Sequence, residues 1–358
     1  MIILKKVLSV VLVISVLMCI LSTTAFASTT ELTTAQKSLL KVQRIDADGD
    51  GDYTTSDASE FLKAAAGIVE NSDGEQYDVD SDGVVSIIDA QKVLKIVSGI
   101  EPVLTEEETL ELFNNNINSV KSVRPGFQKE ATIVCPSIKI TTMNAPIADM
   151  NVTDLEFDKY VDKIVKLMNT FPYNVALDDA MKAQLADMKV QAREAYEPQV
   201  TTKTVDKFSN AHYSYFPVNN LGWSSKLTMN DISSISCTVA DGSIVYTIKM
   251  PTNTYIGDEY PTGSAGFSKR QSLPYGKAFN IPSFDESDGS TVNKVIFKDG
   301  VVVLKVDVVT GDTLSVDYSY GYLVDVTGAK QEDSELVMKT ATTTNVVENY
   351  IMNRVTVK

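Results

Sequence analysis

The chain carries DADGDG at residues 46–51 and, 32 positions later, DVDSDG at residues 78–83. In each copy every second residue offers a carboxylate, and a glycine stands at the sixth position. Hard cations such as Ca²⁺ bind six to eight oxygen ligands, and a short loop supplies them when alternate side chains turn inward. Glycine at position six permits the sharp turn that such a loop makes. The repeat therefore predicts two calcium-binding loops.

The spacing of a 12-residue calcium loop assigns ligands to positions 1, 3, 5, 7, 9 and 12. Position 7 offers its backbone carbonyl, and position 9 often acts through a water. The assigned residues are Asp46, Asp48, Asp50, Asp52, Thr54 and Asp57 in the first loop, and Asp78, Asp80, Asp82, Val84, Ser86 and Asp89 in the second. Position 12 is aspartate in both loops, one methylene shorter than the glutamate usual in EF-hands.

A matching helix is predicted after each loop, from DASEFLKAAAGI at residues 57–68 and DAQKVLKIVSGI at residues 89–100. Each closing aspartate stands near its helix N-terminus, where negative charge is favoured. Gly67 and Gly99 are natural C-terminal stops. No well-formed helix is predicted before either loop. One Asp-Gly-rich stretch can be an ordinary polar turn, but two in the same register, each leading into the same helix, argue for metal binding.

Together, residues 38–102 resemble a type I dockerin, the all-α calcium-dependent module that docks secreted proteins onto cohesin domains of a cellulosome-type scaffold. The aspartate at position 12 and the missing entering helices fit dockerins better than ordinary EF-hands. The resemblance implies two bound Ca²⁺ ions and a cohesin partner. It covers only the N-terminal part of the chain, and the domain at residues 103–358 matches no family by its motifs.

In the dockerin family, loop positions 10 and 11 and one face of the following helix contact the cohesin. The resemblance carries this role to Thr55, Ser56, Leu62 and Lys63 in the first repeat, and to Ile87, Ile88, Leu94 and Lys95 in the second. Because two hydroxyl side chains in the first repeat correspond to two isoleucines in the second, we expect one docking orientation to dominate, with the second repeat as apolar anchor. The alternative is that the isoleucines pack inside the module.

Residues 1–27 are typical of a secretory signal peptide, with a basic start, an apolar run and Ala25-Phe26-Ala27 as a small-residue cleavage site. Met18 precedes Cys19 where a lipoprotein signal would have a small residue. No other segment is long and apolar enough to span a bilayer. We therefore expect a secreted, extracellular protein, attached through its scaffold at the bacterial cell surface.

Acidic residues concentrate in the repeat. The chain has 32 Lys and Arg and 47 Asp and Glu, and cleavage removes two lysines, so the mature chain carries 30 basic residues and a net charge of −17. Residues 46–89 hold 13 acidic residues and one basic residue, Lys63. Without cations this segment should repel itself, so calcium binding should couple to folding. The acidic balance argues against nucleic acid as a partner.

Two cysteines remain after cleavage, Cys135 and Cys237. In a secreted protein an even pair suggests a disulfide, which here would close a long loop. The alternative is two buried free thiols.

The rest of the chain predicts an α+β domain, with helices first and an antiparallel meander sheet afterwards. A Thr105–Glu108 capping box begins a helix with Leu110, Phe113, Ile117 and Val120 on one face. Other expected elements are a strand at 130–142, helices at 153–168 and 178–196, hairpins turning at 241–242 and 299–300, a turn at 310–312, an irregular excursion at 251–293 and a last strand near 335–342. One candidate architecture is a curved sheet around the first helix, similar to bacterial half-barrel lipid-carrier folds.

Candidate catalytic residues are few. The single histidine, His212, excludes a multi-histidine zinc site, and the chain has no Gly-x-Ser-x-Gly elbow; we interpret His212 as a surface or strand-edge residue. Glycoside hydrolysis needs two carboxylates, and Asp258-Glu259 and Asp285-Glu286 are candidates, although solvated loop acids are common. Tyr213, Tyr215, Phe216 and Trp223 could stack on sugars, or could form a buried core.

The sequence thus favours a secreted scaffold-docking protein that carries a non-catalytic binding or structural domain, in a setting where plant cell-wall polysaccharides are degraded. One alternative is a polysaccharide-degrading glycoside hydrolase of an unrecognised family, since dockerins most often carry such enzymes. Another is an inhibitor or adhesin that acts on protein.

Overall fold

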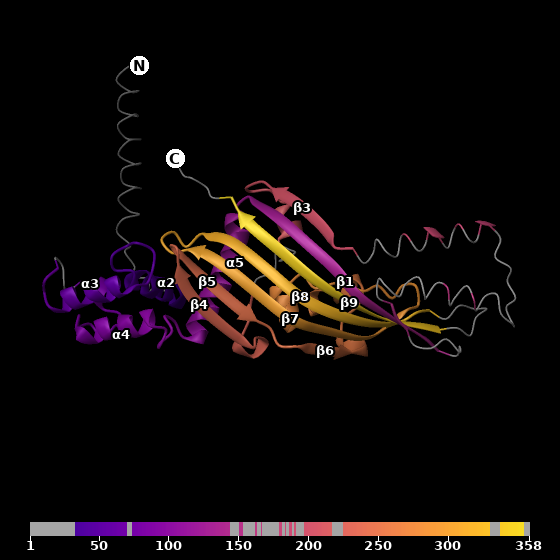
Figure 1. Cartoon of the computed structure of the whole chain (residues 1–358), viewed down its shortest axis with the longest axis horizontal. Helices are drawn as coiled ribbons and strands as arrows, with labels where there is room; N and C mark the ends of the chain where they lie inside the picture. The colour runs from indigo at the N-terminus through magenta and orange to yellow at the C-terminus, as the bar shows by residue number, and fades with distance from the viewer. Residues whose placement is uncertain are drawn as a thin grey trace, which may run out of the picture.

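The computed structural model describes residues 33–69, 74–143, 150–152, 197–216, 225–329 and 337–353, with isolated positions between 162 and 190. The predicted signal peptide and nearly all of the helices expected at 153–168 and 178–196 lie outside these residues. In the described part, helices come first and a long antiparallel sheet follows (Figure 1). None of the helices described there has the length and apolar character that a membrane crossing needs.

The N-terminal module (residues 33–104) packs three helices and a short 3-10 turn around a small apolar core. These are α2 (Thr34–Ile45), α3 (Thr55–Ala65), η1 (Glu75–Tyr77) and α4 (Ile87–Val97). The buried side chains of α3 and α4 recur at helical spacing, as Ala58, Phe61 and Ala64 and as Ala90, Val93 and Ile96. Phe61 meets Tyr77 edge-on, with ring centroids 5.4 Å apart. The two predicted helices after the loops are therefore confirmed, and they share one core.

The expectation of no helix before either loop is wrong for the first loop. Helix α2 runs directly into it, with Asp46 as its C-terminal cap. Its start is fixed by a capping box, in which the Thr33 hydroxyl accepts from the Gln36 N–H at 3.2 Å and Gln36 Oε1 accepts from the Thr33 N–H at 2.9 Å. Only the 3-10 turn η1 precedes the second loop.

Within the described residues, nine strands form one antiparallel sheet in the order β2-β1-β9-β8-β7-β5-β4, with β3 also on β1 and β6 also on β7. The bounds are β1 (Phe127–Met143), β2 (Met150–Val152), β3 (Gln199–Val205), β4 (Ser234–Ala240), β5 (Ser243–Lys249), β6 (Asn253–Ile256), β7 (Thr291–Asp307), β8 (Thr313–Thr327) and β9 (Val337–Met352). The later strands form the predicted meander, but β1 lies beside the last strand, β9. The predicted strands at 130–142 and 335–342 are parts of the longer β1 and β9.

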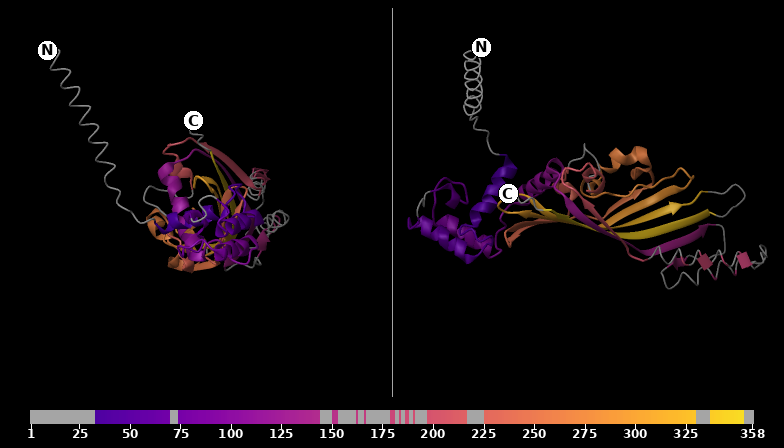
Figure 2. Two further views of the ribbon diagram at one scale, coloured as in Figure 1. Left: turned by 90° about the vertical axis from the view of Figure 1, so that its left-hand side faces the viewer. Right: turned by 90° about the horizontal axis from the view of Figure 1, so that it is seen from above.

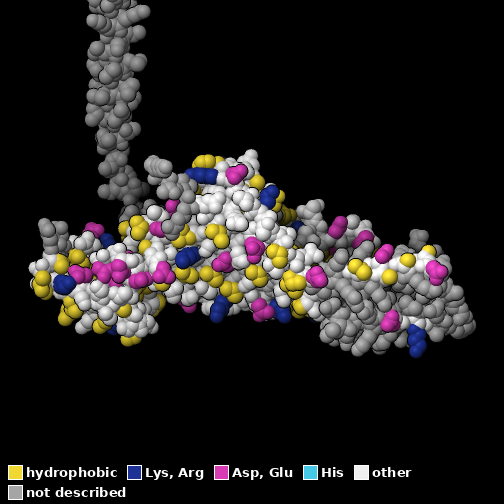
Figure 3. All heavy atoms as spheres, turned by 45° about the horizontal axis from the view of Figure 1, so that its top comes forward, with side chains coloured by type: hydrophobic (Ala, Val, Ile, Leu, Met, Phe, Trp, Pro, Cys, Tyr) yellow, Lys and Arg dark blue, Asp and Glu magenta, His cyan; other side chains and the backbone are white. Residues whose placement is uncertain are grey.

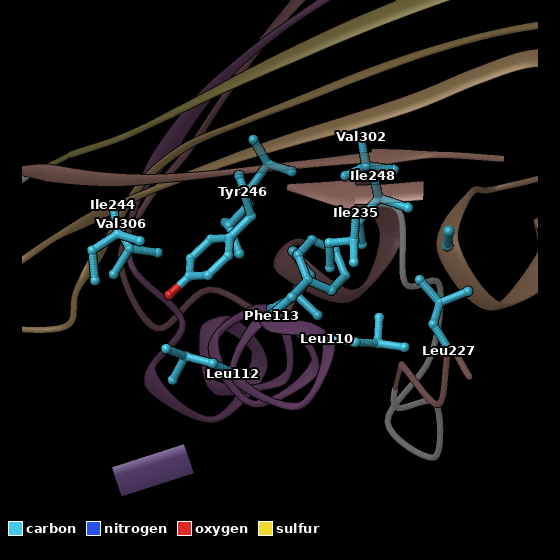
Figure 4. Close-up of a cluster of buried hydrophobic side chains, with 14 of the residues drawn as sticks. Leu110, Leu112, Phe113, Leu227, Ile235, Ile244, Tyr246, Ile248, Val302 and Val306 are labelled. Carbon is cyan, nitrogen blue, oxygen red and sulfur yellow. The ribbon is translucent and has the colours of Figure 1, made fainter. Parts of the chain in front are cut away.

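Helix α5 (Glu106–Val123) lies against one face of the sheet near β4, β5 and β7 (Figure 4). Its predicted capping box is present, and Leu110, Phe113, Ile117 and Val120 are buried as the spacing indicated. Figure 4 shows Phe113 facing Tyr246, Ile235 and Ile248 of the sheet, and the Phe113 and Tyr246 ring centroids are 6.4 Å apart. The first helix of the domain therefore forms the core with the sheet.

The hairpin expected at Asp299-Gly300 is absent, because β7 continues straight through these residues. The register with β8 shifts between Lys298 and Val301, which leaves an extra residue on β7, and Asp299 has a left-handed φ of 54°. Gly300 is required there, because an added Cβ would lie 2.7 Å from the Tyr275 ring. The bulge separates the part of β7 paired with β6 from the part paired with β5.

The other turn predictions are confirmed. Asp241 and Gly242 join β4 to β5 with left-handed φ values of 51° and 65°, as in the two-residue hairpins that favour Asp-Gly. Gly311 turns β7 into β8. The excursion at 251–293 is irregular apart from the first residues of β7 and five short segments: β6, η3 (Gly257–Glu259), η4 (Ser264–Gly266), α9 (Phe267–Arg270) and α10 (Pro274–Ala278). Figure 2 shows the N-terminal module at one end of the twisted sheet.

Candidate metal centre

The first loop brings its alternate carboxylates together. Asp46, Asp48 and Asp50 each direct one oxygen into a group whose atoms all lie within 4.8 Å of one another. Oxygens on opposite sides of a calcium ion are about 5 Å apart, since each Ca–O distance is about 2.3–2.6 Å. These three oxygens are therefore close enough to one another to bind a single metal ion.

The second loop repeats this geometry. Asp78, Asp80 and Asp82 form an equivalent group within the same 4.8 Å limit. The glycines at position six behave alike: the Gly51 N–H donates to Asp46 Oδ2 at 3.0 Å, and the Gly83 N–H donates to Asp78 Oδ2 at 3.0 Å. Their φ values are +89° and +85°, a region that other residues enter only with strain. The duplicated sequence therefore produces duplicated local geometry.

The predicted ligands at position 12 lie beside these groups and hold the loop backbone. Asp57 is fully buried, and its Oδ1 accepts the N–H of Ala47 at 2.8 Å while Oδ2 accepts the N–H of Thr54 at 2.7 Å. Asp89 does the same with Val79 at 2.9 Å and Ser86 at 2.8 Å. Each carboxylate thus ties the beginning of its loop to the residue that caps the following helix. Neither residue is among the three carboxylates of each group.

The predicted ligands at positions 9 and 7 have different surroundings from the three carboxylates of each group. Thr54 and Ser86 at position 9 are the N-caps of α3 and α4, accepting from the N–H of Ser56 and of Ile88, each at 3.1 Å. At position 7, the Val84 side chain is 60% exposed, whereas the Asp52 carboxylate contacts the sheet. Only the backbone carbonyl of this position is expected to bind the ion.

The charge of the first group fits a hard divalent cation. Asp46 Oδ1 is buried with no hydrogen-bond donor, and a buried acceptor without a partner is costly. Burial raises the pKa of Asp46, with further increases from the charges of Asp57 and Asp50 and opposing hydrogen bonds from Gly51 and Gly49. Desolvation likewise raises the pKa of Asp80 in the second loop. A cation held by these oxygens would satisfy Asp46 and offset the repulsion.

The predicted partner-binding side chains all lie on the surface of the N-terminal module. Ile87 and Ile88 are 58% and 56% exposed, and Leu62 and Leu94 are 48% and 46% exposed. Thr55, Ser56, Lys63 and Lys95 are exposed as well. The alternative that the isoleucines pack inside the module is therefore wrong, since Ala90, Val93 and Ile96 fill that role in α4. Figure 3 shows acidic side chains in a band across this module, with hydrophobic side chains beside them.

The two cysteines do not form a disulfide. Both are free and half-buried, Cys135 in β1 and Cys237 in β4. Four strands lie between β1 and β4 in the sheet order. At about 4.8 Å per strand the thiols are on the order of 20 Å apart, whereas a disulfide needs Cα atoms within about 7 Å. Burial raises the pKa of Cys237 to about 12, so this thiol is unreactive.

His212 is neither on the surface nor at a strand edge, which corrects its interpretation from sequence. It begins the short helix α8 (His212–Tyr215) and is fully buried. Its ring is 5.1 Å from that of Phe127 and 5.3 Å from that of Phe216, measured between centroids. Burial, followed by the charges of Arg124 and Lys121, lowers the pKa of His212 to about 4. A neutral histidine therefore belongs to an aromatic core.

Of the proposed sugar-stacking aromatics, the structure describes the side chains of Tyr215 and Phe216, and only Tyr215 is exposed. Phe216 is 1% exposed and packs on Phe127 and Tyr350, so for this residue the core alternative is correct. Tyr215 is 38% exposed. Trp223 and the side chain of Tyr213 lie outside the described part of the chain.

Three of the four candidate catalytic acids bond to the backbone and hydroxyls of their own excursion, and the fourth, Asp258, is exposed. Glu286 accepts the N–H of Val292 and the hydroxyl of Thr262, each at 2.7 Å. Glu259 accepts the N–H of Ile256 at 2.9 Å, and Asp285 accepts the N–H of Ser287 at 3.0 Å. These carboxylates hold irregular backbone in place, which is a structural role.

Comparison with known proteins gave no match at any level: no protein-family model, curated protein or solved structure resembles this chain significantly. The half-barrel comparison and the dockerin resemblance therefore remain predictions from the sequence and geometry.

One contact of the loops was missed from the sequence. The carboxylate of Asp52 accepts the N–H of Asp241 at 2.6 Å, and the carbonyl of Gly51 accepts the N–H of Gly242 at 2.9 Å. The hairpin signal at 241–242 was visible, but nothing in the sequence links that turn to residues 51–52. For α2, by contrast, the capping-box pattern at 33–36 was a usable signal.

Proposed function

We propose that the N-terminal module is a dockerin-type docking module, which binds two Ca²⁺ ions and attaches the sheet domain to a cohesin domain of an extracellular scaffold. The observation that carries the proposal is the pair of converging three-carboxylate groups, each followed by a helix that exposes apolar side chains. Soluble domains rarely expose such side chains side by side without a partner.

The second repeat offers the stronger contact surface. Ile87, Ile88 and Leu94 project from the start and one face of α4, where the first repeat offers Thr55, Ser56 and Leu62. Desolvated apolar anchors contribute more to protein–protein binding than exposed hydroxyls do. This difference supports docking in one orientation, with the second repeat at the centre of the interface.

The sheet domain is proposed to be a binding or structural cargo. Support comes from the acids at 259, 285 and 286, which hold their own backbone, and from the burial of His212 in an aromatic core. Its proposed ligand is plant cell-wall polysaccharide, because dockerin-type modules occur on proteins that take part in degrading such polysaccharides. Reducing-sugar release by the full chain from such polysaccharides would instead support a hydrolase, and capture of a polypeptide would support a protein-directed cargo.

The docking proposal is tested with the chain from residue 28 and a panel of cohesin domains, measured by calorimetry in calcium and in chelator. We expect binding in calcium only. Ile87→Thr with Ile88→Ser, which gives the second repeat the side chains of the first, should weaken binding about thirtyfold or more. Thr55→Ala with Ser56→Ala is the matched control and should change it little. Equal effects of the two pairs, or no cohesin bound in calcium, would contradict the proposal.

A further inference from the structure

The two loops have different surroundings in the folded chain. Loop 1 (residues 46–57) lies against the β4–β5 turn: the N–H groups of Asp241 and Gly242 donate to Asp52 Oδ1 at 2.6 Å and to the carbonyl of Gly51 at 2.9 Å. We name this pair of hydrogen bonds the loop–turn contact. An added Cβ on Gly51 would lie 2.9 Å from the Gly242 Cα, whereas one on Gly83 of loop 2 would meet no atom within 4 Å.

The loop–turn contact shares residues with the predicted calcium site. Asp52 stands at position 7, whose backbone carbonyl is the expected ligand, so its carboxylate is available for the turn. The Asp52 N–H donates to Asp50 Oδ1 at 2.9 Å, which ties this residue to a carboxylate of the metal group. A change in the backbone at Asp52 would therefore affect both the metal group and the hydrogen bond to Asp241.

The turn that receives loop 1 is itself held firmly. Its left-handed residues connect paired strands, and the carbonyl of Gly242 accepts the N–H of Val308 at 3.1 Å. Helix α2 contacts the same region, since Gln43 Nε2 donates to the carbonyl of Val308 at 2.7 Å. Lys41 of α2 also pairs with Glu108 of α5 at 3.1 Å. Loop 1 and α2 thus meet the sheet domain at the same junction.

The side chain at position 8 extends the junction. Tyr53 is partly buried, donates its hydroxyl to the carbonyl of Val42, and packs against the apolar core to which Tyr246 of the sheet belongs. Loop 1 therefore contacts the β4–β5 turn through residues 51 and 52, and residue 53 packs beside them against the buried core.

We infer that the two calcium sites have separate roles: the ion in loop 1 fixes the N-terminal module to the sheet domain, and the ion in loop 2 shapes the surface that meets the partner. The inference rests on the calcium binding proposed above. Linkage requires that the loop–turn contact and calcium in loop 1 strengthen one another by the same factor. Loop 2, whose Gly83 and Val84 are exposed, should bind calcium independently of the sheet.

The test uses Asp52→Ala in the chain from residue 28, because it removes one of the two hydrogen bonds of the loop–turn contact and leaves the backbone carbonyl ligand. Calcium titration by calorimetry should show one site weakened about tenfold, the effect of losing one hydrogen bond to a charged group, and the other unchanged. Val84→Ala, at the same position of loop 2, is the matched control and should leave both sites unchanged. Asp52→Asn, which keeps an acceptor, should recover most of the affinity.

Small-angle X-ray scattering on the same proteins gives a readout independent of affinity. In calcium, wild type and Val84→Ala should have the same radius of gyration, and Asp52→Ala should be larger because the module moves on the sheet. If Asp52→Ala binds two ions with unchanged affinities and has the same radius of gyration as wild type, the separate roles are overturned. The proposal that the module binds calcium would stand. A wild-type chain that binds no calcium would overturn both this inference and the proposed function.

Discussion

In the first repeat, Gly51 and Asp52 bond to a turn of the sheet, whereas Gly83 and Val84 at the same positions of the second repeat face solvent. The local geometry of the two loops is otherwise matched, down to the glycine φ values and the backbone bonds of Asp57 and Asp89. A duplicated motif can therefore keep the same local geometry while the surrounding fold gives each copy different contacts.

The largest expected effect comes from removing predicted metal ligands from one repeat at a time. Asp78→Ala with Asp89→Ala should abolish cohesin binding and speed hydrogen exchange over residues 78–100, because Asp89 holds three backbone N–H groups of loop 2. The matched change in loop 1, Asp46→Ala with Asp57→Ala, should loosen the loop–turn contact and weaken docking less. Unchanged affinity in the loop 2 variant would remove the case for a dockerin.

A smaller effect should reach both repeats, because they share a core. Phe61 of α3 is fully buried and packs on Tyr77, which leads into loop 2. Phe61→Ala should lower the free energy of unfolding by about 3–5 kcal/mol, measured by urea titration in calcium. Leu62→Ala, at an exposed neighbour, should change stability by less than about 0.5 kcal/mol. If Phe61→Ala disturbed one calcium site alone, the repeats would not be one cooperative unit.

The smallest effect isolates the contact itself. Gly51→Ala and Gly83→Ala introduce the same backbone strain, since both glycines have φ near +87° within 2°. Only at Gly51 does the new methyl group collide with Gly242, so we expect this variant to lose about 1–3 kcal/mol more stability in calcium. Thermal unfolding of both variants provides the measurement, and equal losses would mean that the loop–turn contact contributes nothing.

Much of the local structure could be predicted because its causes are local. Alternating aspartates before a glycine specify each loop, and the capping box at Thr105 with its apolar stripe specified α5. The exposure of Ile87 and Ile88 agrees with the surface role that the dockerin resemblance implied, and not with the alternative of packing inside the module. The Asp-Gly pair at 241–242 was also sufficient for a hairpin.

Predictions from the sequence fail where contacts between distant segments of the chain determine the structure. The same Asp-Gly signal at 299–300 gave a bulge, because β8 pairs with β7 on both sides of it. Cys135 and Cys237 each lie in the predicted kind of strand, but the sheet order separates them. His212 sits in a polar sequence and is buried by Phe127 and Phe216. The loop–turn contact joins residues 189 positions apart, beyond the reach of any pattern in the sequence.

The most direct test of this account is amide hydrogen exchange of the chain from residue 28, with and without calcium, resolved at Asp241 and Gly242. These N–H groups donate to loop 1, so their exchange reports the junction directly. We predict that calcium slows exchange in both loops and at these two amides, and that Asp52→Ala removes the protection at Asp241 while loop 2 stays protected. Exchange at loops and turn that is the same with and without calcium would contradict the account.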